Sequence, residues 1–311
     1  MTRRDTADRA ARSRELEREL RRSGFRGRVL RDCPLAPYTT WRIGGPADVL
    51  ALPADADDLR AGVAWAAAGG VPWRVLGNGS NLLVADGGVC GLVLRLRKLL
   101  DDVRIDGTRL TAGAGASFPA VARRAAAAAL SGIEFGAGIP GTIGGAIVMN
   151  AGWHEFEIGN VVETVEVLEP GGPIRTDGRA ACDFGYRRSR FRGRPGVVLR
   201  TTLALTRDDP REVTARLERY AASRKASQPT ELPSCGSVFL KPPGDFAGRL
   251  IEAAGLKGLR VGDVQVSPKH ANFFVNLGHA TATDVLALVE RVEREVEARF
   301  GVRLVREFEL W

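Results

Sequence analysis

From about residue 35 onward, short apolar runs alternate with glycine along the chain. Such runs, bounded by glycine and other turn residues, are typical of strands. Residues 161–168 alternate apolar and acidic side chains, which predicts a strand with one buried face. The other predicted strands are 71–76, 82–85, 92–96, 110–112, 197–205 and 272–276, and residues 302–311 are expected to be extended.

Helical patterns interrupt these strands. In 283–300 the residues Val285, Leu288, Val289, Val292 and Val296 fall on one face, which predicts an amphipathic helix. The remaining predicted helices are 57–68, ended by Gly69 and Gly70, then 118–130, 209–223 and 245–254. Because strands and helices mix without regular βαβ alternation, the pattern favours an α+β fold.

The first 32 residues differ from the rest of the chain. They predict a helix over 9–20 with a thin apolar stripe, which is either solvated and lightly packed or partly disordered. They also contain 11 arginines against six acidic residues, and so supply most of the net charge of +8 in the 311-residue chain. A basic balance of this kind suggests either a nucleic-acid partner or an anionic ligand.

Composition excludes several classes of protein. With 44% hydrophobic and 26% charged residues, the chain is neither collagen-like nor wholly disordered. No apolar run is long enough to span a bilayer, and the basic start is not followed by the apolar core of a signal peptide. The four cysteines and three histidines lack the spacing of a disulfide framework, a metal site or a Ser-His-Asp triad.

Two glycine-rich segments carry the main chemical signal, at 76–82 directly after a predicted strand and at 136–146. Glycine lets successive backbone N–H groups turn toward one anion, and two such loops suit a diphosphate better than a single phosphate. The alternative for either loop alone is a tight structural turn. Neither segment has the Gly-Lys-Ser/Thr ending of a Walker loop or the pattern that opens a Rossmann helix.

Six motifs taken in order closely resemble the UDP-N-acetylenolpyruvoylglucosamine reductase family. They lie at 40–45, 76–83, 138–152, 182–189, 233–239 and 270–273, within a similarity that runs from about residue 37 to residue 307. The resemblance is to the shorter type of this family, which lacks an extra substrate loop. It implies a two-lobed FAD-binding region (PCMH or vanillyl-alcohol-oxidase-like) at 37–100 and 101–208, and an α+β substrate domain at 209–311. Residues 1–36 form a basic extension outside it.

The resemblance also implies FAD as cofactor and NADPH as hydride donor. The residues it assigns to FAD come from the glycine loops and their neighbours. They are Arg42, Ile43, Gly77, Asn78, Gly79, Ser80, Asn81, Leu82, Gly138, Ile139, Pro140, Gly141, Thr142, Gly144, Gly145, Asn150, Ala151 and Gly152.

Three further residues match catalytic positions of the family. Arg187 would stabilise negative charge that develops on the substrate carboxylate, because a guanidinium binds a carboxylate with two hydrogen bonds. Glu307, with Glu309 as a rival, would donate a hydrogen bond in its neutral form, since burial raises the pKa of a carboxyl group. Ser237 would donate the proton that completes the reduction.

The implied substrate is a nucleotide sugar bound by Tyr186, Arg224, Lys241 and His270. Lys241 stands where the family usually has asparagine, and 153–157 departs from the usual small residues. The implied reaction is reduction of UDP-N-acetylglucosamine enolpyruvate to UDP-N-acetylmuramate, by a cytoplasmic monomer without nucleic acid, membrane span or metal. One alternative is a diverged flavin reductase with another substrate. The other is a nucleic-acid-binding protein with 1–32 as a basic arm.

Overall fold

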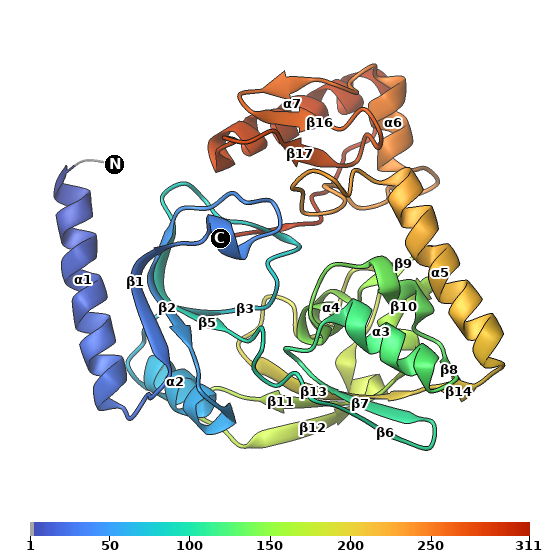
Figure 1. Ribbon diagram of the computed structural model, residues 1–311. Coiled ribbons are helices and arrows are strands. Elements are labelled where there is room, and N and C mark those ends of the chain that lie inside the picture. Colours follow the sequence, from blue (N-terminus) through green and yellow to red (C-terminus); the bar gives the residue numbers. More distant parts are fainter. Residues whose placement is uncertain (1–2) are drawn as a thin grey trace.

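The computed structural model describes residues 3–311 (Figure 1). Its first lobe is built on a four-stranded sheet in the order β1-β2-β5-β3. β1 (Arg28–Pro34) is antiparallel to β2 (Pro46–Leu52), whereas β5 (Val89–Arg95) runs parallel to both β2 and β3 (Trp73–Leu76). The sheet is covered by two helices, α1 (Arg3–Arg22) against β1 and β2, and α2 (Ala56–Ala68) against β5.

The second lobe is a five-stranded antiparallel sheet in the order β12-β11-β13-β7-β6. Its helices α3 and α4 share one apolar core with the sheet and with the first lobe. The bounds are β6 (Val103–Asp106), β7 (Arg109–Gly113), α3 (Phe118–Ala127), β8 (Leu130–Ser131), α4 (Ile143–Met149), β9 (Gly152–Trp153), β10 (Phe156–Glu157), β11 (Val162–Leu168), β12 (Ile174–Gly178), β13 (Val197–Ala204) and β14 (Thr206–Arg207).

The C-terminal part contains the long helix α5 and a small α+β unit. α7 begins with a capping box between Thr281 and Asp284 and ends at Gly301, which adopts the left-handed conformation. Its predicted apolar stripe is fully buried. The bounds are α5 (Pro210–Ser227), α6 (Ala247–Ala253), β15 (Arg260–Val261), β16 (Val264–Val266), β17 (Phe274–Asn276) and α7 (Ala282–Phe300).

The C-terminal unit is fixed to the first lobe by a shared core and by hydrogen bonds. Trp41 of the first lobe is fully buried in the C-terminal core, and its Nε1 donates to the Phe274 carbonyl at 2.9 Å. The chain then returns to the first lobe, where β18 (Glu309–Leu310) pairs in parallel with β4 (Leu82–Leu83). This return brings residue 307 beside the first glycine loop.

Several boundaries differ from the sequence prediction. β1 lies before the domain boundary expected at residue 36, yet it pairs with β2. α5, expected in the C-terminal domain, packs along the second lobe against α3 and 134–138, as Figure 1 shows. The helix predicted over 118–130 ends at Ala127, because Leu130 enters β8. Within 302–311 only β18 is a strand.

The N-terminal helix is packed on the first lobe rather than solvated all round. Leu20 is fully buried, and the Arg12 guanidinium donates to both oxygens of the buried Asp48 carboxylate at 2.6 and 2.8 Å. The apolar stripe is thin because this ion pair replaces part of the apolar contact. No helix within residues 3–311 combines the length and the apolar character that a membrane crossing requires.

Candidate active site

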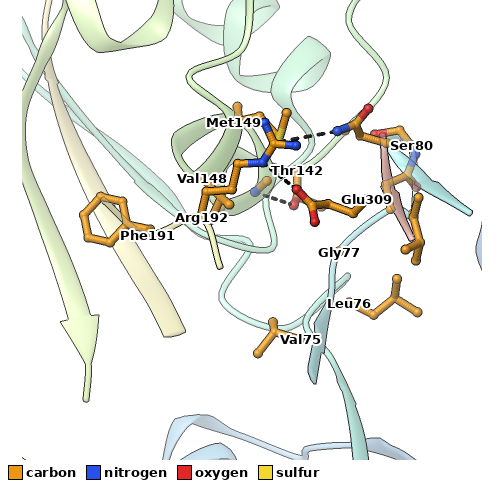
Figure 2. A pocket seen from close by; sticks show the side chains of 18 of the residues that line it. Val75, Leu76, Gly77, Ser80, Thr142, Val148, Met149, Phe191, Arg192 and Glu309 are labelled. Carbon is orange, nitrogen blue, oxygen red and sulfur yellow. Dashed lines mark hydrogen bonds and ion pairs between the residues drawn. The ribbon is translucent and has the colours of Figure 1, made fainter. Parts of the chain in front are cut away.

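A cavity of about 850 Å³ lies where the two lobes and the C-terminal unit meet. The predicted site residues that line it come from both glycine loops, from Arg187, from α5 and from the end of the chain. They are Gly77, Asn78, Gly79, Ser80, Asn81, Leu82, Ile139, Pro140, Gly141, Thr142, Gly144, Gly145, Ala151, Gly152, Arg187, Arg224, Ser237, Glu307 and Glu309. Figure 2 shows several of these around the cavity, with Val75 and Leu76 on the β3 side.

The two glycine loops face each other at close range. A Cβ on Gly77 would lie 2.6 Å from Thr142 Oγ1, and one on Gly79 would lie 2.4 Å from the Tyr38 carbonyl oxygen. Both distances are too short for a side chain, and Gly79 also has a positive φ of 61°. Gly77 therefore allows the close approach of the two loops, and Gly79 allows the first loop to pass close to the Tyr38 backbone.

The backbone of these loops fits a diphosphate. Within residues 3–311, the N–H groups of Asn78, Gly79, Ser80 and Asn81 donate to no protein acceptor, and the same is true of Gly141. Backbone donors are rarely left without a partner, so the four consecutive N–H groups of the first loop, with Gly141 N of the second, form a ready anion site. The cavity beside them has a volume of about 850 Å³, and its lining runs from β3 to α5. These residues fit FAD.

Four of the residues assigned to FAD lie outside the cavity lining. Ile43 is buried in the core that joins the first lobe to the C-terminal unit, and Arg42 beside it has a φ of 55°. A Cβ on Gly138 would contact Arg224 at 2.7 Å. Asn150 is 1% exposed and fixes the chain around the site, since its side chain donates to Glu157 and the Gly185 carbonyl and accepts from Gly159 N.

Arg187 lies at the corner of a tight turn, where Gly185 and Arg188 exchange backbone hydrogen bonds of 2.9 Å. Its φ of 52° is in the left-handed region, which is unfavourable for any residue with a Cβ. The turn directs the guanidinium to Glu307, where Arg187 Nε donates to Oε1 at 2.9 Å, and to the Gly152 carbonyl, also at 2.9 Å. Arg187 and Glu307 thus form an ion pair from segments 120 residues apart.

Glu307 and Glu309 differ in their surroundings. The Glu307 side chain is 13% exposed and that of Glu309 is 43% exposed. Burial raises the pKa of Glu307, and the positive charges of Arg187 and Arg192 only partly offset this effect. Glu309 instead pairs with Arg192, as Figure 2 shows. Glu307 is therefore the more buried of the two rivals, and burial raises its pKa.

Ser237 lines the cavity beside Cys235 and Phe273. The pairing of Ser237 with Phe273 holds the serine segment against the strand region that precedes β17. Cys235 is 3% exposed, and burial together with the nearby charge of Glu307 raises the pKa of its thiol well above the ordinary value. A thiol in this environment stays neutral, so Ser237 lies in a site without a competing thiolate.

Of the four residues assigned to substrate binding, one lines the cavity. Arg224 lines the cavity, and burial lowers its pKa to about 10, so it remains a cation at neutral pH. Tyr186 is half exposed, and its hydroxyl accepts a hydrogen bond from Lys241 N at 3.3 Å. His270 packs edge-on against Phe273, and burial lowers the pKa of its imidazole. Tyr186, Lys241 and His270 lie outside the cavity lining.

Sequence reasoning missed Arg192, Trp153 and Cys235, all of which line the cavity. Arg192 was hidden in a run of basic residues that reads as a solvated surface. Trp153 belongs to the segment that departs from the family pattern, and it forms the hairpin β9–β10 that packs against Tyr220 of α5. That departure was the available signal for Trp153.

The chain was compared with known proteins. Residues 228–311 match the family model for the UDP-N-acetylenolpyruvoylglucosamine reductase C-terminal domain, and residues 47–178 match an FAD binding domain. A relative named UDP-N-acetylenolpyruvoylglucosamine reductase from Heliobacterium modesticaldum is 46% identical over 91% of this chain and 90% of its own. One with the same name from Rubrobacter xylanophilus is 48% identical over 88% of this chain and 92% of its own.

A crystal structure of UDP-N-acetylenolpyruvylglucosamine reductase from Thermus caldophilus is also similar. It is 40% identical, with a TM-score of 0.78, over 92% of this chain and 99% of that chain. These matches, together with the two lobes and the C-terminal unit, confirm the predicted α+β fold with an FAD-binding region. By sequence over most of its length and by fold, the chain belongs to the UDP-N-acetylenolpyruvoylglucosamine reductase family.

Proposed function

We propose that this protein uses NADPH and FAD to reduce UDP-N-acetylglucosamine enolpyruvate to UDP-N-acetylmuramate, a step in peptidoglycan precursor synthesis. The observation that carries this proposal is the Arg187–Glu307 pair, which lies at the wall of the cavity formed by the two glycine loops. A cation and a carboxyl group of raised pKa together suit a substrate whose own carboxylate gains charge during the reaction.

The two glycine loops would hold FAD, which would supply hydride equivalents from NADPH to the terminal carbon of the enol ether. Addition there would move the electron pair of the double bond toward the substrate carboxylate. Arg187 binds that carboxylate and stabilises the enolate-like charge. Glu307 in its neutral form donates a hydrogen bond to the same group, which is possible because the side chain is largely buried.

Protonation completes the reduction. The Ser237 hydroxyl gives its proton to the carbon that bears the ether oxygen, and it recovers a proton from solvent. The enolpyruvyl group thereby gains one hydride and one proton and becomes a lactyl ether. Arg224 supplies a positive charge to the substrate diphosphate. The sugar is bound by Tyr186, Lys241 and His270.

The colour of the protein and its consumption of NADPH test the proposal. The purified protein should be yellow, and its consumption of NADPH should rise when the enolpyruvyl nucleotide sugar is added. A yellow protein without this rise would indicate a flavin reductase with another substrate. A colourless protein that releases no flavin on denaturation would contradict the proposal altogether.

Ser237→Ala tests the proton donor. We expect reduction of the flavin by NADPH to change by less than about threefold, and the second half-reaction to fall by about 10²–10⁴-fold, the usual contribution of a general acid. Stopped-flow flavin absorbance measures both rates. Ser234→Ala, three residues earlier and outside the cavity lining, is the matched control. Equal loss of both half-reactions would contradict the assigned role.

We further propose that the protein acts in the cytoplasm as a monomer and does not bind nucleic acid. In support, four of the six α1 arginines after residue 7 pair with carboxylates, among them Arg12–Asp48, Arg18–Glu15 and Arg22–Glu19, so this part of the helix is not a free basic arm. Sedimentation tests the monomer. Salt-sensitive DNA binding that survives deletion of residues 1–24 would contradict the absence of nucleic acid.

A further inference from the structure

Arg192 makes three hydrogen bonds from one guanidinium. Its Nε donates to the Glu309 carboxylate, its Nη1 to the Arg187 carbonyl at 3.0 Å, and its Nη2 to the Glu307 carbonyl at 3.1 Å. The side chain is 27% exposed and lines the cavity (Figure 2). One side chain therefore joins the turn that carries Arg187 to the segment that carries Glu307.

Both segments need such support. Arg187 has a positive φ of 52° at a turn position that favours glycine, so its backbone tends to relax unless neighbouring groups hold it. Residues 304–308 form no strand. Glu307 N donates to the Val238 carbonyl at 2.8 Å, and the Glu307 carbonyl accepts from Asn81 Nδ2 at 3.3 Å. The Arg192 bond to that carbonyl is the one that also reaches the Arg187 turn.

We infer that Arg192 is a positioning residue that sets the separation of Arg187 and Glu307 by holding the carbonyl groups of both. This inference rests on the proposed function, because it assigns to Arg192 the geometry of the same reaction. The planar fork of a guanidinium can serve three acceptors in fixed directions, whereas a lysine ammonium acts as a single point charge. Glu309 orients the fork by accepting from Nε.

Substitution of Arg192 should slow the second half-reaction and leave reduction of the flavin by NADPH nearly unchanged. Arg192→Met removes all three hydrogen bonds and should lower the rate of the second half-reaction by about 10–100-fold, since a misplacement of about 1 Å costs up to that factor. Reduction of the flavin by NADPH should change by less than threefold. Arg192→Lys keeps the positive charge but not the fork, and should stay impaired by at least fivefold. Stopped-flow measurements with FAD-loaded protein give both rates.

Arg188→Met is the matched control, because Arg188 lies in the same turn, is 64% exposed and pairs only with Asp183 among the described side chains. It should retain both rates. Full activity in Arg192→Met or Arg192→Lys would overturn the inference, as would equal loss of both half-reactions. If Arg192→Met does not fold, the two rates of Arg192→Lys carry the same test.

A measurement independent of turnover separates this inference from the proposed function. In a crystal structure of FAD-loaded Arg192→Met, the Arg187 Nε to Glu307 Oε1 distance of 2.9 Å should increase beyond hydrogen-bonding range. An unchanged distance and an unchanged Arg187 turn would overturn the positioning role. If the wild-type enzyme fails to use the enolpyruvyl nucleotide sugar, the proposed function falls, and this comparison still decides the role of Arg192.

Discussion

Glu307 is subject to two opposing effects. Burial disfavours its charged form, and the guanidinium groups of Arg187 and Arg192 favour it; the net result is a pKa above the ordinary value of 4.5. A carboxyl group whose pKa is higher in the folded than in the unfolded state binds more protons when folded. Stability must therefore fall as pH rises from about 4.5 through the folded pKa.

Glu307→Gln removes this dependence while keeping an oxygen that can accept from Arg187. We expect the free energy of unfolding of the variant, relative to wild type, to increase between pH 4 and pH 7.5. Urea unfolding with saturating FAD at the two pH values measures it. A difference between the proteins that is the same at both pH values would contradict a raised pKa. Glu309→Gln, at the more exposed carboxylate, is the comparison.

At this scale the sequence motifs led to residues that the structure brings together. Arg187, Ser237, Glu307 and the two glycine loops do line one cavity. The choice between Glu307 and Glu309 could not be predicted, because residues two apart in an extended segment point to the same side. What distinguishes them is burial and their partners: Glu307 is the more buried and pairs with Arg187, 120 residues away, whereas Glu309 pairs with Arg192, 117 residues away. No local pattern carries that information.

Among the elements, α1 is a helix that the sequence pattern predicts but whose contact with the first lobe it does not predict. The sequence predicted the helix, but it favoured light packing because the apolar stripe is thin. The structure seats α1 through Asp48, a carboxylate in the middle of β2 that is fully buried and also accepts from Gly91 N. A partner 36 residues away cannot be read from helical periodicity.

Arg12→Met tests this attachment. It removes the two hydrogen bonds to Asp48 and leaves Arg9, at 3.9 Å, as the remaining nearby cation. We expect a loss of about 1–3 kcal/mol in the free energy of unfolding, at the lower end because Arg12 is half exposed to solvent. Chemical denaturation measures it. Arg14→Met, on the exposed side of the same helix, should change stability by less than about 0.5 kcal/mol.

The packing partner of α5 also could not be predicted from its sequence pattern. Its sequence predicted a helix that begins at Asp209-Pro210, and the structure confirms the start. Its packing was assigned to the C-terminal domain, whereas Arg216 of α5 bonds to Glu134 of the second lobe at 3.0 Å. A periodic pattern indicates which face is buried, but it does not indicate which partner buries it.

Across the whole molecule, the C-terminal unit contacts parts of the first lobe that are far from it in sequence. β18 pairs with β4, Trp41 enters the C-terminal core, and the Asp86 carboxylate accepts from the first backbone N–H groups of α7 at 2.8 and 2.9 Å. The C-terminal unit is therefore fixed to the first lobe. The sequence predicted an extended end but not this return, because a two-residue parallel pairing has no signature of its own.

The first glycine loop lies between β3 and β4, and its Asn81 carbonyl accepts from Glu309 N at 3.0 Å. FAD that orders this loop should also protect β18. We expect the amide of Glu309 to exchange its hydrogen at least about tenfold more slowly in the FAD-loaded protein than in the FAD-free protein. Hydrogen–deuterium exchange of the C-terminal peptide measures it, with a peptide from α7 as reference. Equal exchange in both forms would contradict the link.

The pairing of β18 with β4 therefore affects how tightly FAD is bound. Linked equilibria are reciprocal. If binding of FAD stabilises the pairing of β18, then the pairing of β18 increases the affinity for FAD by the same free energy. Leu310 is 48% exposed and lies outside the cavity lining. A substitution there that weakens the pairing of β18 is thus expected to raise the dissociation constant for FAD, although the side chain is not part of the cavity. Protein short of flavin is then expected to have a less ordered last strand.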